Sequence, residues 1–234
     1  MTSLPLEEFD KAKQLILGAQ RILIISHKNP DADSIGANLA IREALENIGK
    51  TVTSTSVDPV PESCLFLRKA EAYVRYFKLE DFDLVITVDC GSHKLMAFHE
   101  TMPDLLDRNK VKLINIDHHP SNDNFGNANI VMAQTPATCF ILFVLFSYYG
   151  WSITPTMATS LLQGLYYDTG SFMHSNTTAD SLRIAARLKA LGADLERSVK
   201  EQFHTASISK LRLWGRALER ATLNEKQAVV TAVT

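Results

Sequence analysis

The sequence predicts an α/β protein built on a mainly parallel sheet of five or six strands, with helices on both faces. Three observations support this fold class. Short apolar runs rich in β-branched residues alternate along the chain with longer segments of helical periodicity. Three of these runs, at residues 21–26, 84–88 and 112–116, are mostly apolar, as is typical of strands buried in a parallel sheet. Polar residues follow each of the three directly, where the loops at the carboxyl edge of such a sheet would lie.

The elements are expected to alternate in order along the chain. A helix at 6–19 begins after Pro5 and has two acidic residues in its first turn, both favoured at helix starts. The first strand leads through a polar turn into a helix at 34–48 that Gly49 ends. Further strands are expected at 51–56, 73–77, 84–88, 112–116, 128–132 and 227–233. Further helices are expected at 62–68, 103–108, 137–149, 155–167, 180–191, 195–204 and 207–223.

Size and composition limit the function classes. With 234 residues, the chain is long enough for one large or two small domains with a substantial core. A net charge of −2 argues against a surface that coats long nucleic acids, but it allows a local pocket for a short phosphate-bearing ligand. The sequence shows neither a signal peptide nor a run of the ~20 apolar residues that span a bilayer. We therefore predict a cytoplasmic protein that does not bind membranes.

The three cysteines are predicted to be small core residues. Cys64, Cys90 and Cys139 fall in separate segments without a C-x-x-C spacing, which indicates neither a disulfide framework nor a zinc site. Buried free thiols are ordinary in a reduced cytosolic protein.

The turn after the first strand carries the first group of candidate metal ligands. His27, Asp31 and Asp33 lie within seven residues of each other, between an apolar strand and a predicted helix. Pro30 is expected to hold Asn29 in an extended conformation and so to let the two carboxylates converge. Asp33 alone would be explained as a helix cap. Capping does not explain His27 and Asp31 beside it, so a metal site is the favoured interpretation.

Three other elements end in residues of the same kind. Asp89 ends the strand at 84–88, Asp117-His118-His119 ends the strand at 112–116, and Asp168 ends the helix at 155–167. Carboxylate and imidazole groups suit a divalent ion of intermediate hardness such as Mn²⁺. About seven such groups at neighbouring strand ends favour two ions, which can clamp the attacking and leaving oxygens of a phosphoryl displacement. A core histidine or a capping aspartate could explain any one of these residues. It would not explain why four separate segments all end in such residues.

These motifs resemble a known family. The segment from His27 to Gly36, then Val88-Asp89, then Asp117-His118-His119, then 168–172 is similar to the four ordered motifs of the DHH phosphoesterases with a RecJ-like catalytic domain. Residues 168–192 resemble the bacterial oligoribonuclease (nanoRNase) and pAp-phosphatase branch. The resemblance implies a DHH domain at 1–192, a helical connector at 193–226 and the first strand of a DHHA1 domain at 227–234. The rest of that second lobe is expected to be absent, because no Gly-Gly-His-type motif is present.

The resemblance also implies roles for individual residues. One metal ion would be held by His27, Asp31 and Asp89. The other would be held by Asp33, Asp89, His118 and Asp168. His119 would contact the scissile phosphate, and Asp117 would fix an imidazole tautomer. Further phosphate contacts are expected from Ser34, Gly36, Ser92 and Asn176.

The activity that follows from the resemblance is hydrolysis of phosphate esters by a hydroxide activated between two Mn²⁺ ions, with Mg²⁺ or Co²⁺ as substitutes. The expected substrates are short RNA oligonucleotides, linear dinucleotides or 3′-phosphoadenosine-5′-phosphate (pAp), with no long duplex nucleic acid among the partners and a homodimer as one assembly. Two alternatives stay open. One is a manganese-dependent inorganic pyrophosphatase of the same superfamily, and the other is a weakly active nucleotide- or phosphate-binding module.

Overall fold

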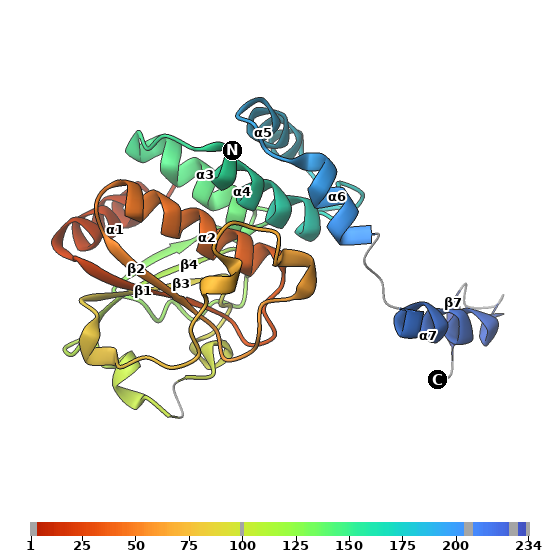
Figure 1. The fold of residues 1–234 in the computed structure, drawn as a ribbon, viewed down its shortest axis with the longest axis horizontal. Coiled ribbons are helices and arrows are strands. Elements are labelled where there is room, and N and C mark those ends of the chain that lie inside the picture. The colour runs from red at the N-terminus through yellow and green to blue at the C-terminus, as the bar shows by residue number, and fades with distance from the viewer. Residues whose placement is uncertain (1–3, 99–100, 204–207, 225–228, 233–234) are drawn as a thin grey trace. The chain divides into compact units, whose positions relative to one another are not determined.

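The computed structural model describes residues 4–98, 101–203, 208–224 and 229–232 (Figure 1). The chain divides into two compact units, Met1–Ser198 and Val199–Thr234, and each is described by itself. The domain boundaries predicted at 192 and 226 stay predictions.

The first unit is built on a five-stranded, fully parallel sheet with the order β2-β1-β3-β4-β5. Its strands are β1 (Arg21–Ser26), β2 (Thr51–Thr55), β3 (Leu84–Val88), β4 (Lys112–Asp117) and β5 (Ala128–Val131). From β1 the chain goes to one side of the sheet for β2 and to the other side for β3. Ligand crevices form where the strand order reverses in this way, outside the carboxyl ends of the strands. The predicted fold class is confirmed.

Long helices cover one face of the sheet, as Figure 1 shows. They are α1 (Leu6–Gly18), α2 (Ala32–Asn47), α3 (Thr138–Tyr149) and α4 (Pro155–Asp168), with α5 (Ala179–Ala190) packed on α3 and α4. Alternate side chains of the central strands, such as Ile22, Ile86 and Ile114, point into this layer and are fully buried. Because α3 is apolar on almost every side, it lies inside the layer, and the other helices carry the polar surface.

Short helical turns cover the opposite face. Leu23, Val85 and Leu113 pack there against the residues around η4 (His93–Met96) and η5 (Pro103–Leu106). Both faces therefore carry helical segments, but those on this face are single 3₁₀ turns. The remaining 3₁₀ turns are η1 (Glu62–Cys64), η2 (Ala70–Ala72) and η3 (Leu79–Asp81).

Two predicted elements are wrong in this part of the chain. The helix expected at 62–68 shortens to η1, and the strand expected at 73–77 contributes only a single bridge between Val74 and Thr55. Leu65 and Tyr76, two apolar residues on which these elements depended, are 50% and 92% exposed, so burial of their side chains stabilises neither element.

Two glycines bring α2 and α4 into backbone contact. A Cβ atom on Gly36 of α2 would lie 2.3 Å from the carbonyl oxygen of Ser160 in α4. A Cβ atom on Gly164 of α4 would lie 2.6 Å from Oδ1 of Asp33 in α2. No side chain fits in either space, so the glycines set the distance between the helices. This close contact brings α4 against the start of α2, where the candidate ligands lie.

The second unit contains most of α6 (Leu195–Phe203), then α7 (Ile208–Glu219), β6 (Ala221–Asn224) and β7 (Val229–Ala232). The strand predicted at 227–233 forms β7 over its described residues, and β7 pairs antiparallel with β6. The helix predicted at 207–223 therefore ends earlier, because its last residues form a strand of this hairpin. The parts of these predictions that fall on residues 204, 207, 225–228, 233 and 234 lie outside the described residues. Within the described ranges, no helix has both the length and the apolar character needed to cross a bilayer.

Candidate metal centre

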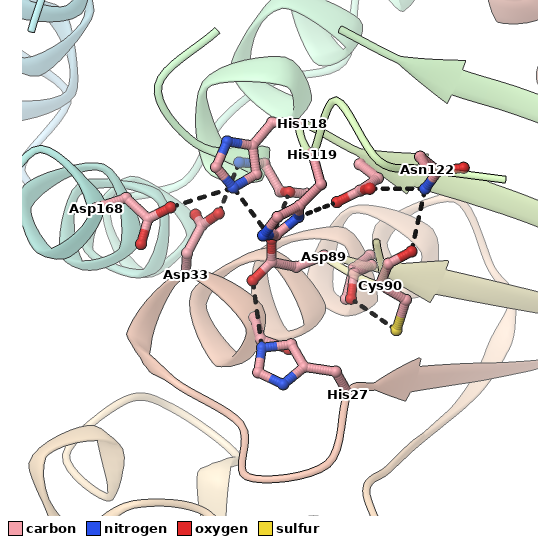
Figure 2. A network of polar contacts seen from close by, with 12 residues as sticks. His27, Asp33, Asp89, Cys90, His118, His119, Asn122 and Asp168 are labelled. Carbon is pink, nitrogen blue, oxygen red and sulfur yellow. Dashed lines mark hydrogen bonds and ion pairs between the residues drawn. The ribbon is translucent and has the colours of Figure 1, made fainter. Parts of the chain in front are cut away.

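The predicted ligands meet at the carboxyl edge of the sheet, around the point where the strand order reverses (Figure 2). His27 follows β1, Asp89 follows β3, and His118 follows β4. Asp168 is the last residue of α4, which reaches the same edge from the helical layer. Residues from four separate segments thus form one cluster of carboxylates and imidazoles.

His27, Asp31 and Asp89 form the first group of candidate donors. Nε2 of His27 lies 3.4 Å from Oδ2 of Asp89 and 3.9 Å from Oδ1 of Asp31. The other ring nitrogen, Nδ1, lies 2.7 Å from the carbonyl oxygen of Lys28 and donates to it. This hydrogen bond fixes the ring and directs Nε2 towards the carboxylates, the usual arrangement for a metal-binding histidine.

Asp33, His118 and Asp168 form the second group. Nε2 of His118 lies 3.2 Å from Oδ2 of Asp168 and 3.4 Å from Oδ1 of Asp89. Its Nδ1 is 3.4 Å from the carbonyl oxygen of Thr135, so here too the ring presents Nε2 to the cluster. A third group, Asp89, His118 and His119, shares residues with these two. The assignment of ligands to two ions that the family resemblance implies stays a prediction.

Asp89 connects the two groups. Its Oδ2 faces His27 and its Oδ1 faces His118, so one carboxylate lies between both sets of donors. The residue has a left-handed backbone (φ 59°), a conformation that aspartate tolerates better than most side chains. The hydroxyl of Thr138 donates to Oδ1 over 3.1 Å. Asp89 is only 2% exposed, and this burial together with the hydrogen bond holds its carboxylate between the two donor groups.

The residue that caps α2 is Asp31, and not Asp33 as the sequence alone would suggest. Asp31 is the cap of α2, and its Oδ1 accepts from the backbone N–H groups of Asp33 and Ser34, each at 3.0 Å. Asp33 is fully buried and accepts from the N–H groups of Thr138 (2.6 Å) and Cys139 (3.0 Å) at the start of α3. The positive end of α3 therefore stabilises the charge of Asp33.

The conformation predicted for Asn29 is wrong. Its φ is +51°, not extended, although a proline follows it. The backbone N–H of Asn29 donates to Oδ2 of Asp58 over 2.8 Å. This tertiary hydrogen bond and the tolerance of asparagine for the left-handed region outweigh the preference imposed by Pro30.

The charges of the cluster call for a cation. Burial and the nearby charge of Asp89 raise the pKa of Asp33 and also that of Asp168. Burial alone would lower the pKa of His27 and of His118. Hydrogen bonds to the carboxylates outweigh burial and raise the pKa of His27 to about 10 and that of His118 to about 11. Burial would raise the pKa of Asp89 too, but the hydrogen bonds from the two histidines lower it. Protons on Nε2 thus partly balance the carboxylates, and divalent cations bound to the same atoms would supply that balance.

Asp117 and His119 form a pair beside the cluster. Nδ1 of His119 donates to Oδ1 of Asp117 over 2.8 Å, and Asp117 is fully buried. The His119 ring lies against that of His118, with 4.5 Å between ring centroids. Nδ1 of His119 is also 3.7 Å from Oδ1 of Asp89, but the shorter contact commits it to Asp117. The tautomer-fixing role that the family resemblance implies for Asp117 stays a prediction, which this contact supports.

The four residues expected to bind phosphate make contacts within the protein. The Ser34 amide donates to Asp31, and Gly36 is covered by Ser160 of α4. The Ser92 hydroxyl accepts from the N–H of Lys94, and the Asn176 amide donates to the carbonyl of Asp168 over 3.0 Å. Phosphate binding by these four residues stays a prediction.

Sequence reasoning missed Thr138 and Cys139, which hold two of the candidate ligands. They are the first two residues of α3, the most apolar helix among the described residues. A threonine at the start of such a helix is the one local indication that its side chain makes a hydrogen bond. Their partners lie far earlier in the chain: Thr138 is 105 residues from Asp33 and 49 residues from Asp89. No local pattern reveals that pairing.

The fold and the donor groups define an α/β protein with a candidate metal centre at the carboxyl edge of its sheet. The model of the DHH family, N-terminal domain, matches residues 21–185. The chain therefore belongs to the DHH family of phosphoesterases.

Several named proteins are similar to this chain. The bifunctional oligoribonuclease and PAP phosphatase NrnA of Thermus thermophilus is 34% identical over 214 residues, covering 90% of this chain and 62% of that protein. The protein of the same name from Bacillus subtilis is 23% identical, covering 88% and 64%. A probable manganese-dependent inorganic pyrophosphatase of Streptococcus mutans is 25% identical, covering 75% and 57%. The chain thus spans about three fifths of the length of these relatives.

A solved structure shows the same fold. The exopolyphosphatase-related protein from Bacteroides fragilis superposes with a TM-score of 0.86 at 22% identity, covering 96% of this chain and 68% of that one. At this identity the likeness concerns the fold alone.

Proposed function

We propose that this chain is a Mn²⁺-dependent phosphoesterase that hydrolyses short oligoribonucleotides, linear dinucleotides or pAp. The observation that carries the proposal is the position of Asp89, whose two oxygens face two separate groups of His and Asp donors. Such a shared carboxylate is what a pair of ions ~3.5–4 Å apart requires. The similarity to the Thermus thermophilus enzyme over 90% of the chain supports the substrate class.

The ligands are assigned from the two donor groups. One ion would be held by His27, Asp31 and Asp89. The other would be held by Asp33, Asp89, His118 and Asp168. When bound, two divalent ions lower the pKa of a water between them and neutralise charge on a phosphoryl group. The donor set of oxygens and imidazole nitrogens, without a thiolate, fits Mn²⁺, with Mg²⁺ or Co²⁺ as substitutes.

The protein's own residues prepare this site for a phosphate ester. Thr138 and the α3 amides keep Asp89 and Asp33 in place, so little rearrangement is needed at the moment of reaction. His119 is 43% exposed and has Nδ1 committed to Asp117, which leaves Nε2 to contact the scissile phosphate. The Asp117 hydrogen bond raises the pKa of His119, which favours the charged form that an anionic substrate attracts.

The test compares three substrates with Mn²⁺ present: a labelled dinucleotide, pAp and pyrophosphate. We expect the first two to be hydrolysed faster than pyrophosphate. Fastest turnover of pyrophosphate would instead establish the pyrophosphatase alternative, to which the Streptococcus mutans relative points.

Thermal unfolding with Mn²⁺ tests whether the metal site forms, independently of whether the chain hydrolyses a substrate. Binding to the folded state alone adds RT ln(1 + [Mn²⁺]/Kd), about 2.7 kcal/mol at a hundredfold excess over Kd. We expect the melting temperature to rise with Mn²⁺ and to fall again with chelator. A rise without turnover of any of the three substrates would favour the binding-module alternative, and no rise at millimolar Mn²⁺ would refute the metal centre.

A further inference from the structure

Asn122 lies in the loop after β4, beside the candidate metal centre. Its side-chain Nδ2 donates to Oδ2 of Asp117 over 2.6 Å and to the carbonyl oxygen of Cys90 over 3.0 Å. Figure 2 shows these contacts beside the His119–Asp117 pair. A turn brings the residue there, because the Asn122 N–H donates to the carbonyl of His119 over 3.1 Å.

The orientation of the Asn122 amide is fixed by four partners. The Asp117 carboxylate and the Cys90 carbonyl can only accept, so they must face the NH₂ group. The amide oxygen accepts from Nδ2 of Asn115 and from the backbone N–H of Asn124, each at 2.8 Å. A flipped amide would lose all four hydrogen bonds, so Asn122 has one stable orientation.

Asn122 holds two groups that contact His119. One is Asp117, whose other oxygen accepts from the His119 ring. The other is the carbonyl of Cys90, and the next residue, Gly91, lies against the His119 side chain. A Cβ atom on Gly91 would be only 3.2 Å from Cβ and Cγ of His119.

We infer that Asn122 is a positioning residue for the proposed phosphoesterase reaction: by holding Asp117 and the Cys90–Gly91 segment, it fixes the orientation of the His119 ring. The inference rests on the proposed function for its catalytic consequence, but not for its structural part. A carboxylate with one free oxygen can rotate, whereas Asp117 is held at both oxygens. His119 therefore keeps Nδ1 as its donor and presents Nε2 in one direction only.

Asn129 offers a matched control in the same region. Its side chain also joins backbone and side-chain groups, accepting from the Gly126 N–H at 2.8 Å and from Asn115 Nδ2 at 3.4 Å. It has no hydrogen bond to Asp117 or Cys90 among the described residues. A loss caused only by a weakened loop should therefore appear in Asn129→Ala as well as in Asn122→Ala.

The experiment measures catalysis and ring orientation separately. Hydrolysis of bis-p-nitrophenyl phosphate with Mn²⁺ gives kcat and KM, and calorimetry gives the Mn²⁺ affinity. Nitrogen-15 NMR of the metal-free protein detects the hydrogen-bonded Nδ1–H of His119, assigned by its absence in His119→Gln.

We expect Asn122→Ala to lower kcat about ten- to a hundredfold, as for other partners that orient a functional histidine, with KM and Mn²⁺ affinity little changed. The Nδ1–H signal should be lost, whereas Asn129→Ala keeps both kcat and the signal.

Asn122→Asp is a second variant in case the alanine variant does not fold. It keeps the oxygen that accepts from Asn115 and Asn124 but removes both donors, so it should reproduce the loss of kcat and of the signal. An unchanged signal in either folded variant, or an equal loss in Asn129→Ala, would overturn the inference. If the wild-type protein hydrolyses no ester, the proposed function fails, and the NMR comparison still decides whether Asn122 positions His119.

Discussion

Replacing Gly164 by alanine is expected to weaken the metal centre from within the core. The new methyl group would lie 2.6 Å from Oδ1 of Asp33, whereas real Cβ atoms essentially never come closer than 3.0 Å, so one group must move by at least 0.4 Å. On its other side the methyl group meets Sγ of Cys139 at 2.4 Å. Asp33 cannot yield freely, because the N–H groups that open α3 hold both of its oxygens.

Two opposing terms determine the stability of this variant. Overpacking a dense core costs about 1–3 kcal/mol, and alanine gains about 1 kcal/mol over glycine within a helix. The net loss is therefore about 0–2 kcal/mol, which lowers the melting temperature by up to about 8 °C for a domain of this size. The Mn²⁺ affinity should fall about ten- to a hundredfold, the effect typical of disturbing the groups that hold metal ligands.

Thermal unfolding in chelator and Mn²⁺ calorimetry measure the two effects separately. Gly36→Ala is the matched control, because the three atoms nearest to its methyl group belong to Ser160 (carbonyl oxygen at 2.3 Å) and Cys139 (Sγ at 3.3 Å), and none to a candidate ligand. It should lose similar stability but less Mn²⁺ affinity. Gly18→Ala has no neighbouring atom within 4 Å and should lose neither. Equal Mn²⁺ affinity in Gly164→Ala and Gly36→Ala would refute the reasoning.

Three further outcomes are expected. Asp89→Ala should abolish Mn²⁺-dependent hydrolysis and the rise in melting temperature with Mn²⁺ while leaving the circular dichroism of the metal-free protein unchanged; near wild-type turnover would disprove the bridging role. Thr138→Val removes the hydroxyl that donates to Asp89 but keeps the backbone, and should weaken Mn²⁺ binding about tenfold by calorimetry with little change in stability. Burial would raise the pKa of Glu46, but hydrogen bonds from Lys69 and Arg42 lower it below its usual 4.5. Its ionised form therefore adds stability above that pH and loses it as the pH falls, so Glu46→Gln should cost up to about 1 kcal/mol at neutral pH and progressively less in acid unfolding curves.

The parallel sheet and its strand ends could be predicted from the sequence. β1 and β3 occupy the predicted residues 21–26 and 84–88, because strands buried on both faces form continuous apolar runs that few other elements resemble. Once the strands are known to be parallel, their carboxyl ends share one edge. The convergence of His27, Asp89 and His118 follows from that geometry alone.

The contacts that hold the ligands could not be predicted in the same way. Local spacing allows either Asp31 or Asp33 to cap α2, and the choice depends on the start of α3, more than 100 residues later. The role of Asn122 depends on a turn and on the neighbouring β3 loop, and its segment looks like an ordinary polar loop. The helix predicted at 207–223 fails at its end, because strand pairing between β6 and β7 outweighs the helical periodicity there.

The wide spacing of the candidate ligands has a consequence for biosynthesis. The ribosome releases the chain from its N-terminus, so His27 and Asp33 emerge long before α3 and Asp168 have been made. Until then Asp33 lacks the amides that hold it, and His118 lacks Asp168 as a partner. The group of His27, Asp31 and Asp89 is therefore made first, and the group of Asp33, His118 and Asp168 is complete only after α4 has left the exit tunnel.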